Sequence, residues 1–253
     1  PGAGLQTTSA DSPGHDPAPI AQHFPFDRQR TMGAGETVAS VLSPMDSGPA
    51  PALQAVESEE RRSHVREIRA ASLTGFVEVS YFLDLDPFAL LRQARISPSF
   101  LDDPENWHAA RPITEMVENA AAQSGCDAFG LLMAECRSFA SLGPLSLLLQ
   151  HLPTVGEVLG ALNDYRRLMN DVASLECIPG EDSTIFCWTV VPGYETTQGT
   201  DLAIGVIYRI LTEALGGSWA PEVVHFRHSP PRDLKIFRQF FHVPIEFDSK
   251  FRG

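Results

Sequence analysis

The sequence changes its periodicity where TVGEVLGALNDYRRLMN (residues 154–170) gives way to DVASLECIPGEDSTIFCWTVV (residues 171–191). The first stretch opens with a Thr154–Glu157 capping box and continues with apolar residues every three or four positions, which predicts a helix. The second stretch predicts a β-hairpin around a turn at residues 179–183. Helical patterns dominate before this junction, and strands interleaved with helices follow it. We therefore predict an α+β fold: an N-terminal helical layer followed by a small mixed or antiparallel sheet with packed helices.

Helix caps extend this prediction to both sides of the junction. A helix is expected from Ser63 through Leu73, with Ser63 as its N-cap. Asp127 and Asp201 are predicted to cap the helices that follow them, because a side-chain oxygen at this position accepts free backbone N–H groups. The helix after Asp201 is expected to stop at Gly216-Gly217. Further elements are expected as helices from Asp86-Pro87 and over 112–124, 145–151 and 233–241, a single turn at 97–101, and strands over 222–227 and 244–247.

The chain is predicted to hold one folded domain behind a leader. Residues 1–62 are rich in Pro, Gly and Ser and cannot support a packed face, so we expect them to be disordered. Residues 63–253 carry the helical and strand patterns and form the predicted domain. Hydrophobic residues make up 43% of the 253-residue chain, which is enough for one sizeable core.

Charge and hydropathy argue against two kinds of partner. The formal net charge is −13, whereas a surface that binds nucleic acid needs positive charge against the phosphates. No stretch approaches the roughly 18 uninterrupted apolar residues of a membrane span, and the N-terminus carries no recognisable signal peptide. We therefore expect a cytoplasmic chain that contacts neither DNA nor membrane directly.

The four cysteines, Cys126, Cys136, Cys177 and Cys187, form no CxxC pair. In a cytosolic protein they are expected to be reduced, buried and small apolar side chains. An alternative is a redox clip between Cys177 and Cys187, because the two residues flank the hairpin turn symmetrically.

Motifs that would indicate catalysis were not found. The sequence has no phosphate-binding glycine loop, no HExxH or comparable metal spacing, and no GxSxG nucleophile elbow. His225 and His228 point to opposite faces if both lie on a strand, which argues against a shared metal. We expect no enzyme activity, no metal and no cofactor, and the composition favours a binding module.

The stretch from Leu73 to the C-terminus resembles the N-terminal, arabinose-binding-like domain of AraC/XylS transcription regulators. The order and spacing of several short segments carry the resemblance. The sequence departs from the family at two places. Ser146 stands where family members usually have glycine, and Ala94-Arg95 replaces their usual pair of a small residue and a glycine before Ile96. These segments are residues 73–76, 85–92, 129–135, 142–148, 153–159, 221–228, 230–231 and 240–247.

The resemblance implies a regulatory role. Such a domain is a sensor for a small-molecule effector and often a homodimerisation surface, while a C-terminal double helix-turn-helix reads DNA. We expect that DNA-binding domain to be missing from this chain, which ends where a linker should begin. The implied function is therefore to bind an effector, such as a metabolite, fatty acid or amino-acid-like molecule, and to control the absent domain.

Five residues are candidates for the effector site, each with an ordinary structural alternative. Tyr165 and Arg166 end the capped helix, where an arginine can bind a carboxylate through two parallel hydrogen bonds; the alternative is a solvated arginine. Trp188 lies in mid-strand and can stack on a ligand or pack in the core. Arg209 interrupts an apolar helix; we expect it to face either a ligand pocket or, as the alternative, water. His225 alternates with apolar residues and contacts a ligand or sits in the core.

Two rival functions remain open at this stage. The chain can instead be an orphan α+β enzyme or lipid-carrier domain, in which case the purified protein turns over a substrate. It can also be a pure dimerisation module, which predicts no enclosed pocket and no stabilisation by any metabolite.

Overall fold

The computed structural model describes residues 65–250, except for 153, 180–182 and 215–218. Three predictions lie outside these residues: the disordered leader over 1–62, the N-cap at Ser63 and the helix stop at Gly216-Gly217. No helix within the described part of the chain is long and apolar enough to cross a membrane.

Helices dominate the first half of the domain. The capped segment at Asp86 is confirmed: its carboxylate accepts hydrogen bonds from the N–H groups of Phe88 and Ala89, and Pro87 occupies the first helical position. The single turn predicted at residues 97–101 is also present, as a 3₁₀ helix. The elements of this half are β1 (Glu67–Arg69), η2 (Ala70–Leu73), α2 (Phe76–Phe82), α3 (Pro87–Gln93), η3 (Pro98–Asp102), β2 (Trp107–Ala109), α4 (Ala110–Ser124), α5 (Phe129–Glu135), η4 (Phe139–Leu142), α6 (Pro144–Leu149), α7 (Val155–Asp164) and η5 (Arg166–Leu168).

The second half mixes strands and helices, as the change of periodicity predicted. Its elements are β3 (Ala173–Pro179), β4 (Thr184–Val190), α8 (Thr197–Ala214), β5 (Val224–His225), α9 (Lys235–Phe241) and β6 (Ile245–Glu246). The α+β fold class is therefore confirmed. The strands form three separate ladders of two strands each: β1–β2 and β3–β4 are antiparallel and β5–β6 is parallel. Helices separate these ladders along the chain, so no continuous sheet forms among the described residues.

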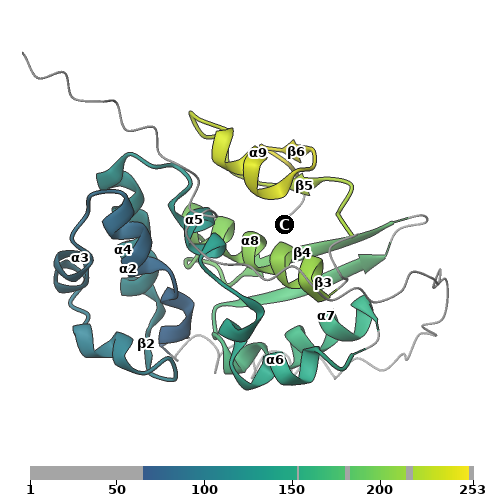
Figure 1. Cartoon of the computed structure of the whole chain (residues 1–253), viewed down its shortest axis with the longest axis horizontal. Helices are drawn as coiled ribbons and strands as arrows, with labels where there is room; N and C mark the ends of the chain where they lie inside the picture. Colours follow the sequence, from purple (N-terminus) through teal and green to yellow (C-terminus); the bar gives the residue numbers. More distant parts are fainter. Residues whose placement is uncertain (1–64, 153, 180–182, 215–218, 251–253) are drawn as a thin grey trace, which may run out of the picture.

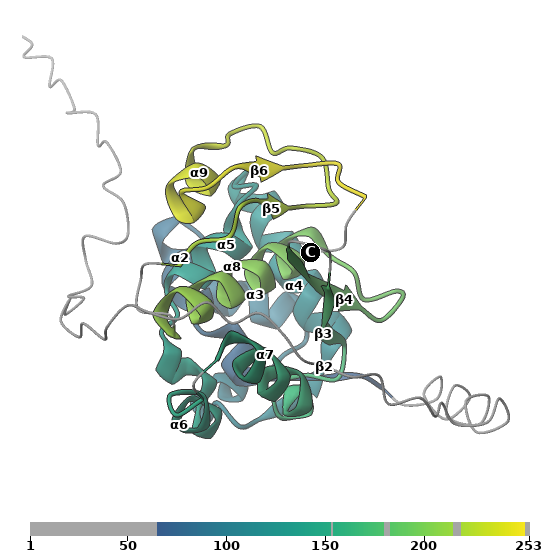
Figure 2. The ribbon, with the colours of Figure 1, turned by 90° about the vertical axis from the view of Figure 1, so that its right-hand side faces the viewer.

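Helix α8 runs through the middle of the molecule (Figure 1). Helices α5 and α4 pack on it from one side, and the hairpin β3–β4 contacts it from another. Figure 2 shows α9 and the β5–β6 pair above α8, with α6 and α7 on the opposite side. Residues of α8 belong to, or pack against, each of the three hydrophobic clusters that form the core of the described structure.

The hairpin β3–β4 has the register expected for a tight antiparallel pair. Cys177 lies opposite Phe186, and Cys187 lies opposite Glu176. Because successive residues of a strand point to opposite faces, the two thiols are on different sides of the hairpin. Cys177 is exposed, Cys187 is buried, and neither forms a disulfide. The alternative of a redox clip between them is wrong for this structure.

The helix predicted through Leu73 is wrong. Residues Glu67–Arg69 form a strand that pairs with β2, and only a 3₁₀ turn follows. Burial explains this outcome: Ile68 lies in the core, and the buried Arg69 side chain forms an ion pair with Glu105, with 2.9 Å between Nη1 and Oε1. These contacts across the chain outweigh the weak local helical preference.

The caps predicted at Asp127 and Asp201 are also wrong. Helix α8 begins at Thr197, so Asp201 lies inside it, fully buried. The carboxylate of Asp127 accepts hydrogen bonds from the backbone N–H and the guanidinium of Arg232, all at 3.1 Å. In both cases a charged partner far away in the sequence binds the carboxylate, so it is not available to the neighbouring backbone N–H groups.

Candidate functional site

A cavity of about 180 Å³ lies where the hairpin β3–β4 meets α8. Helix α4, the turn η2 and the end of α7 complete its wall. Most of the lining side chains are apolar, as is usual for sites that bind small organic molecules. Examples of these side chains are Leu73, Ile113, Val117, Leu175, Val206 and Ile210.

Two arginines contribute the charged groups of this cavity. Arg137 follows α5 and donates a hydrogen bond from Nη2 to the carbonyl oxygen of Ser72. Its Nε atom is buried without a hydrogen-bond partner. Burial lowers the pKa of the Arg137 guanidinium to about 10, so this group is still charged at neutral pH. Arg166 begins η5 and donates from Nη1 to the carbonyl of Asn163 at 2.9 Å.

The other polar groups of the wall are largely engaged with the protein itself. The side-chain oxygen of Asn170 accepts the N–H groups of Val172 and Ala173. The hydroxyl of Ser174 bonds that of Thr189 on the neighbouring strand at 2.7 Å. These contacts shape the start of β3, and they leave the two guanidinium groups as the strongest hydrogen-bond donors of the wall.

The structure brings together two of the five side chains that the sequence nominated. Arg166 and Trp188 both line the cavity. Tyr165 does not line it and is 45% exposed. Arg209 lies on α8 outside the cavity, where it donates to the carbonyl of Glu135 and pairs with Glu213. The Nδ1 atom of His225 lies 3.2 Å from an oxygen of Glu246, and the residue lines a second, more open groove, which Trp188 also borders.

Arg137 was not among the sequence candidates. It lies in a short connection after a buried helix, and no local pattern distinguishes it from a surface arginine. Its place in the wall depends on packing against Ser72, which is 65 residues away in the sequence. Only the arrangement in space could have identified it.

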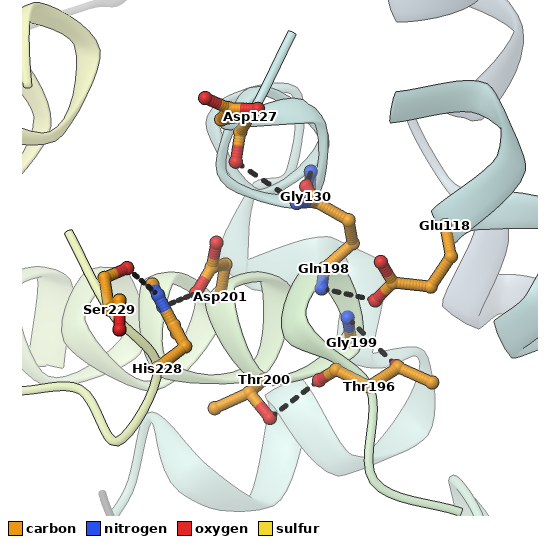
Figure 3. A network of polar contacts seen from close by, with 10 residues as sticks. All are labelled: Glu118, Asp127, Gly130, Thr196, Gln198, Gly199, Thr200, Asp201, His228 and Ser229. Carbon is orange, nitrogen blue, oxygen red and sulfur yellow. Dashed lines mark hydrogen bonds and ion pairs between the residues drawn. The ribbon is translucent and has the colours of Figure 1, made fainter. Parts of the chain in front are cut away.

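A second polar feature joins α4, α5 and α8 (Figure 3). The Glu118 carboxylate accepts the N–H of Gln198 at 2.6 Å, in the first turn of α8. The side-chain oxygen of Gln198 accepts the N–H of Gly130 at 2.8 Å, and its amide nitrogen donates to the carbonyl of Asp127. Gln198 therefore supplies the cap that was predicted from Asp127, and it does so from another helix.

The same network reaches the C-terminal segment through His228. Its Nε2 lies 2.8 Å from an oxygen of Asp201, and its Nδ1 contacts the carbonyl of Ser229. Burial, the largest influence, raises the pKa of Asp201, although the hydrogen bond from His228 lowers it. Burial lowers the pKa of His228, but the bond to Asp201 and its charge outweigh this and raise it overall. The pair fixes the segment after α8 against the central helix.

No group of three or more His, Cys, Asp and Glu side chains that could hold a metal ion gathers among the described residues. His228 does not share a site with His225, because the two imidazoles bind different carboxylates, those of Asp201 and Glu246.

Comparison with known proteins defines the class of this chain. Its relatives are transcriptional regulators: the HTH-type transcriptional regulator VirS of Mycobacterium tuberculosis, in strains CDC 1551 / Oshkosh and ATCC 25618 / H37Rv, is 26% identical over 195 residues. The match covers 74% of this chain and 56% of VirS, so the chain spans little more than half the length of these relatives. The crystal structure of the transcriptional regulator CdpR from Pseudomonas aeruginosa is similar over 67% of this chain and 51% of that one, with 17% identity and a TM-score of 0.43.

The family follows from a second comparison. The family described as the N-terminal arabinose-binding domain of AraC transcription regulators matches residues 85–253, which is more than half of the chain. The chain therefore belongs to this family, and the resemblance seen in the sequence is confirmed.

Proposed function

We propose that this domain binds a small-molecule effector in the cavity between the hairpin β3–β4 and α8. The observation that carries the proposal is the cavity itself: a largely apolar wall with two arginines, inside a domain of a regulator family. Apolar cavities of about this volume hold molecules the size of benzene. A ligand there contacts both the hairpin and the central helix, so binding can change how the two pack.

The effector signal passes, in this proposal, to a helix-turn-helix domain in another part of the protein. The acidic charge of −13 supports a division of labour in which this chain senses and another part binds DNA. We further propose that the regulator is a cytoplasmic homodimer and that this domain catalyses no reaction. To act as a switch, the effector must bind the two states of the regulator with different affinity.

A ligand screen by thermal unfolding tests effector binding. A ligand at a hundred times its dissociation constant stabilises the native state by about 2.7 kcal/mol, which raises the melting temperature by several degrees. We expect at least one small apolar metabolite to give such a shift. The variant Ala203→Phe fills the cavity from α8 and is expected to abolish the shift while unfolding cooperatively on its own.

Three results would contradict the proposal. If no metabolite stabilises the protein, the domain acts as a dimerisation module. If a stabilising compound is chemically converted by the purified protein, the domain is an enzyme. Stabilisation that persists unchanged in Ala203→Phe would place the ligand outside this cavity.

A further inference from the structure

The charges around the cavity are opposite to the charge of the chain. The protein carries 32 acidic and 19 basic side chains, yet the lining includes two arginines and no aspartate or glutamate. Elsewhere in the described structure arginines are commonly paired with acids: Arg69 with Glu105, Arg209 with Glu213 and Arg232 with Asp127. Arg137 and Arg166 have no such ion pair with any residue that the structure describes. The wall is therefore a local excess of positive charge in an acidic protein.

Arg137 is the more informative of the two residues. Its one hydrogen bond goes to a neutral carbonyl, that of Ser72, and its buried Nε donor has no acceptor. Burying a charged donor without an acceptor is unfavourable, and natural structures usually satisfy such groups. Because the Arg137 guanidinium lines the cavity, an anionic ligand there would offer acceptors to its remaining N–H groups.

Arg166 lines the same cavity and can take part in binding. In the described part of the chain, its guanidinium donates only from Nη1, to the carbonyl of Asn163. A guanidinium has five N–H donors in a planar fork that matches the two oxygens of a carboxylate. The remaining lining is apolar and includes the Trp188 indole, which suits a hydrocarbon or aromatic body.

We propose that the ligand of this cavity is a small carboxylate with an apolar body, whose carboxylate is bound by Arg137 and Arg166. The inference rests on the proposed function, because it names the chemical class of the effector. Two guanidinium groups offer enough N–H donors for both oxygens of one carboxylate, and the apolar wall matches the rest of a small organic acid.

The test compares acids with their uncharged amides. The probes are benzoate, hexanoate and octanoate, each beside benzamide, hexanamide and octanamide, with binding measured by calorimetry and by quenching of Trp188 fluorescence. We expect at least one acid to bind and its amide to bind at least about tenfold more weakly, because charge-assisted hydrogen bonds are about twice as strong as neutral ones. Trp188→Phe is expected to remove the quenching, which identifies Trp188 as its source.

Variants of the arginines identify the binding groups. Arg137→Gln and Arg166→Gln are each expected to weaken binding of the acid by roughly ten- to a hundredfold, with little change for the amide. Arg167→Gln is the matched control, since Arg167 is the exposed neighbour of Arg166 and does not line the cavity. If Arg137→Gln lacks a cooperative unfolding transition, Arg166→Gln decides the outcome.

The results separate this inference from the proposed function. Equal binding of acid and amide, or binding of the acid that neither arginine variant weakens, overturns the carboxylate ligand but leaves a small-molecule sensor. Failure of every acid in the panel to bind also overturns it, and the metabolite screen with Ala203→Phe then decides the proposed function by itself.

Discussion

His228→Ala is expected to destabilise the domain by about 3 kcal/mol or more, because it leaves the buried Asp201 carboxylate without its partner. Asp201 is fully buried and its second oxygen already has no hydrogen-bond partner. Breaking a buried ion pair by removing one member usually costs about 3–5 kcal/mol, since the remaining charge is uncompensated. The measurement is the free energy of unfolding from urea titrations at neutral pH.

The matched variant is Asp201→Asn, which keeps the shape of the side chain and a hydrogen bond to His228 but removes the charge. We expect it to cost clearly less than His228→Ala. In the double variant, the loss of His228 should cost much less than it does in the native protein, because no buried charge is left behind. If the two single variants are equally destabilising and their effects add, Asp201 and His228 are not coupled and the interpretation is wrong.

The same pair is expected to set the pH dependence of stability. The folded pKa of His228 is raised above its ordinary value of 6.5, so its contribution is fully present below that pH and is lost as the pH rises through the folded pKa. The raised pKa values of Asp201 and Glu118 have the same sign, but their contribution begins to be lost at lower pH, as the pH rises above their ordinary values of 3.8 and 4.5. Stability should therefore fall from pH 6 towards pH 8, and Asp201→Asn should flatten this slope. A native stability that rises over this range would contradict the assignment.

Gly130→Ala is expected to destabilise the domain by about 3 kcal/mol, the upper end of the range for overpacked cores. Gly130 lies in α5 where this helix crosses the first turn of α8. A Cβ atom at this position would lie 2.9 Å from the carbonyl carbon of Gln198 and even closer to its oxygen. These are backbone atoms, so the two helices must separate, and the hydrogen bond from Gly130 to the Gln198 side chain is strained or lost.

Whether Gly130→Ala lowers or raises the stability distinguishes a tightly packed helix crossing from an exposed helix position. In an exposed helix, replacing glycine with alanine stabilises by up to about 1 kcal/mol. Gly160 in α7 provides the control: it is exposed and a Cβ there meets nothing within 4 Å. Gly160→Ala should therefore raise the melting temperature while Gly130→Ala lowers it. A neutral or stabilising Gly130→Ala would mean that α5 and α8 can separate at little cost.

Part of the candidate site could be predicted from the sequence. Arg166 and Trp188 were nominated because each lies at a recognisable place, one at the end of a capped helix and the other in the middle of a strand. Arg137 could not be nominated, because its place in the wall depends on a contact with Ser72 in η2, 65 residues away in the sequence. The same kind of local pattern nominated Tyr165, Arg209 and His225, which do not line this cavity. A local pattern can therefore identify an exposed or alternating position, but not whether the side chain there faces the cavity.

The sequence by itself determined the α+β class, the hairpin, the helices capped by Asp86 and Thr154, and the family, because caps, turns and hydrophobic periods act between residues a few positions apart. Tertiary structure alone decided what Asp127, Asp201 and Gln198 do, since their partners Arg232, His228 and Gly130 lie 105, 27 and 68 residues away. It also decided that an apolar wall closes around two arginines. A periodic pattern indicates which face of a helix or strand is buried. The side chains that cover this face come from other elements, so only the packing of these elements determines which charged side chains line a cavity.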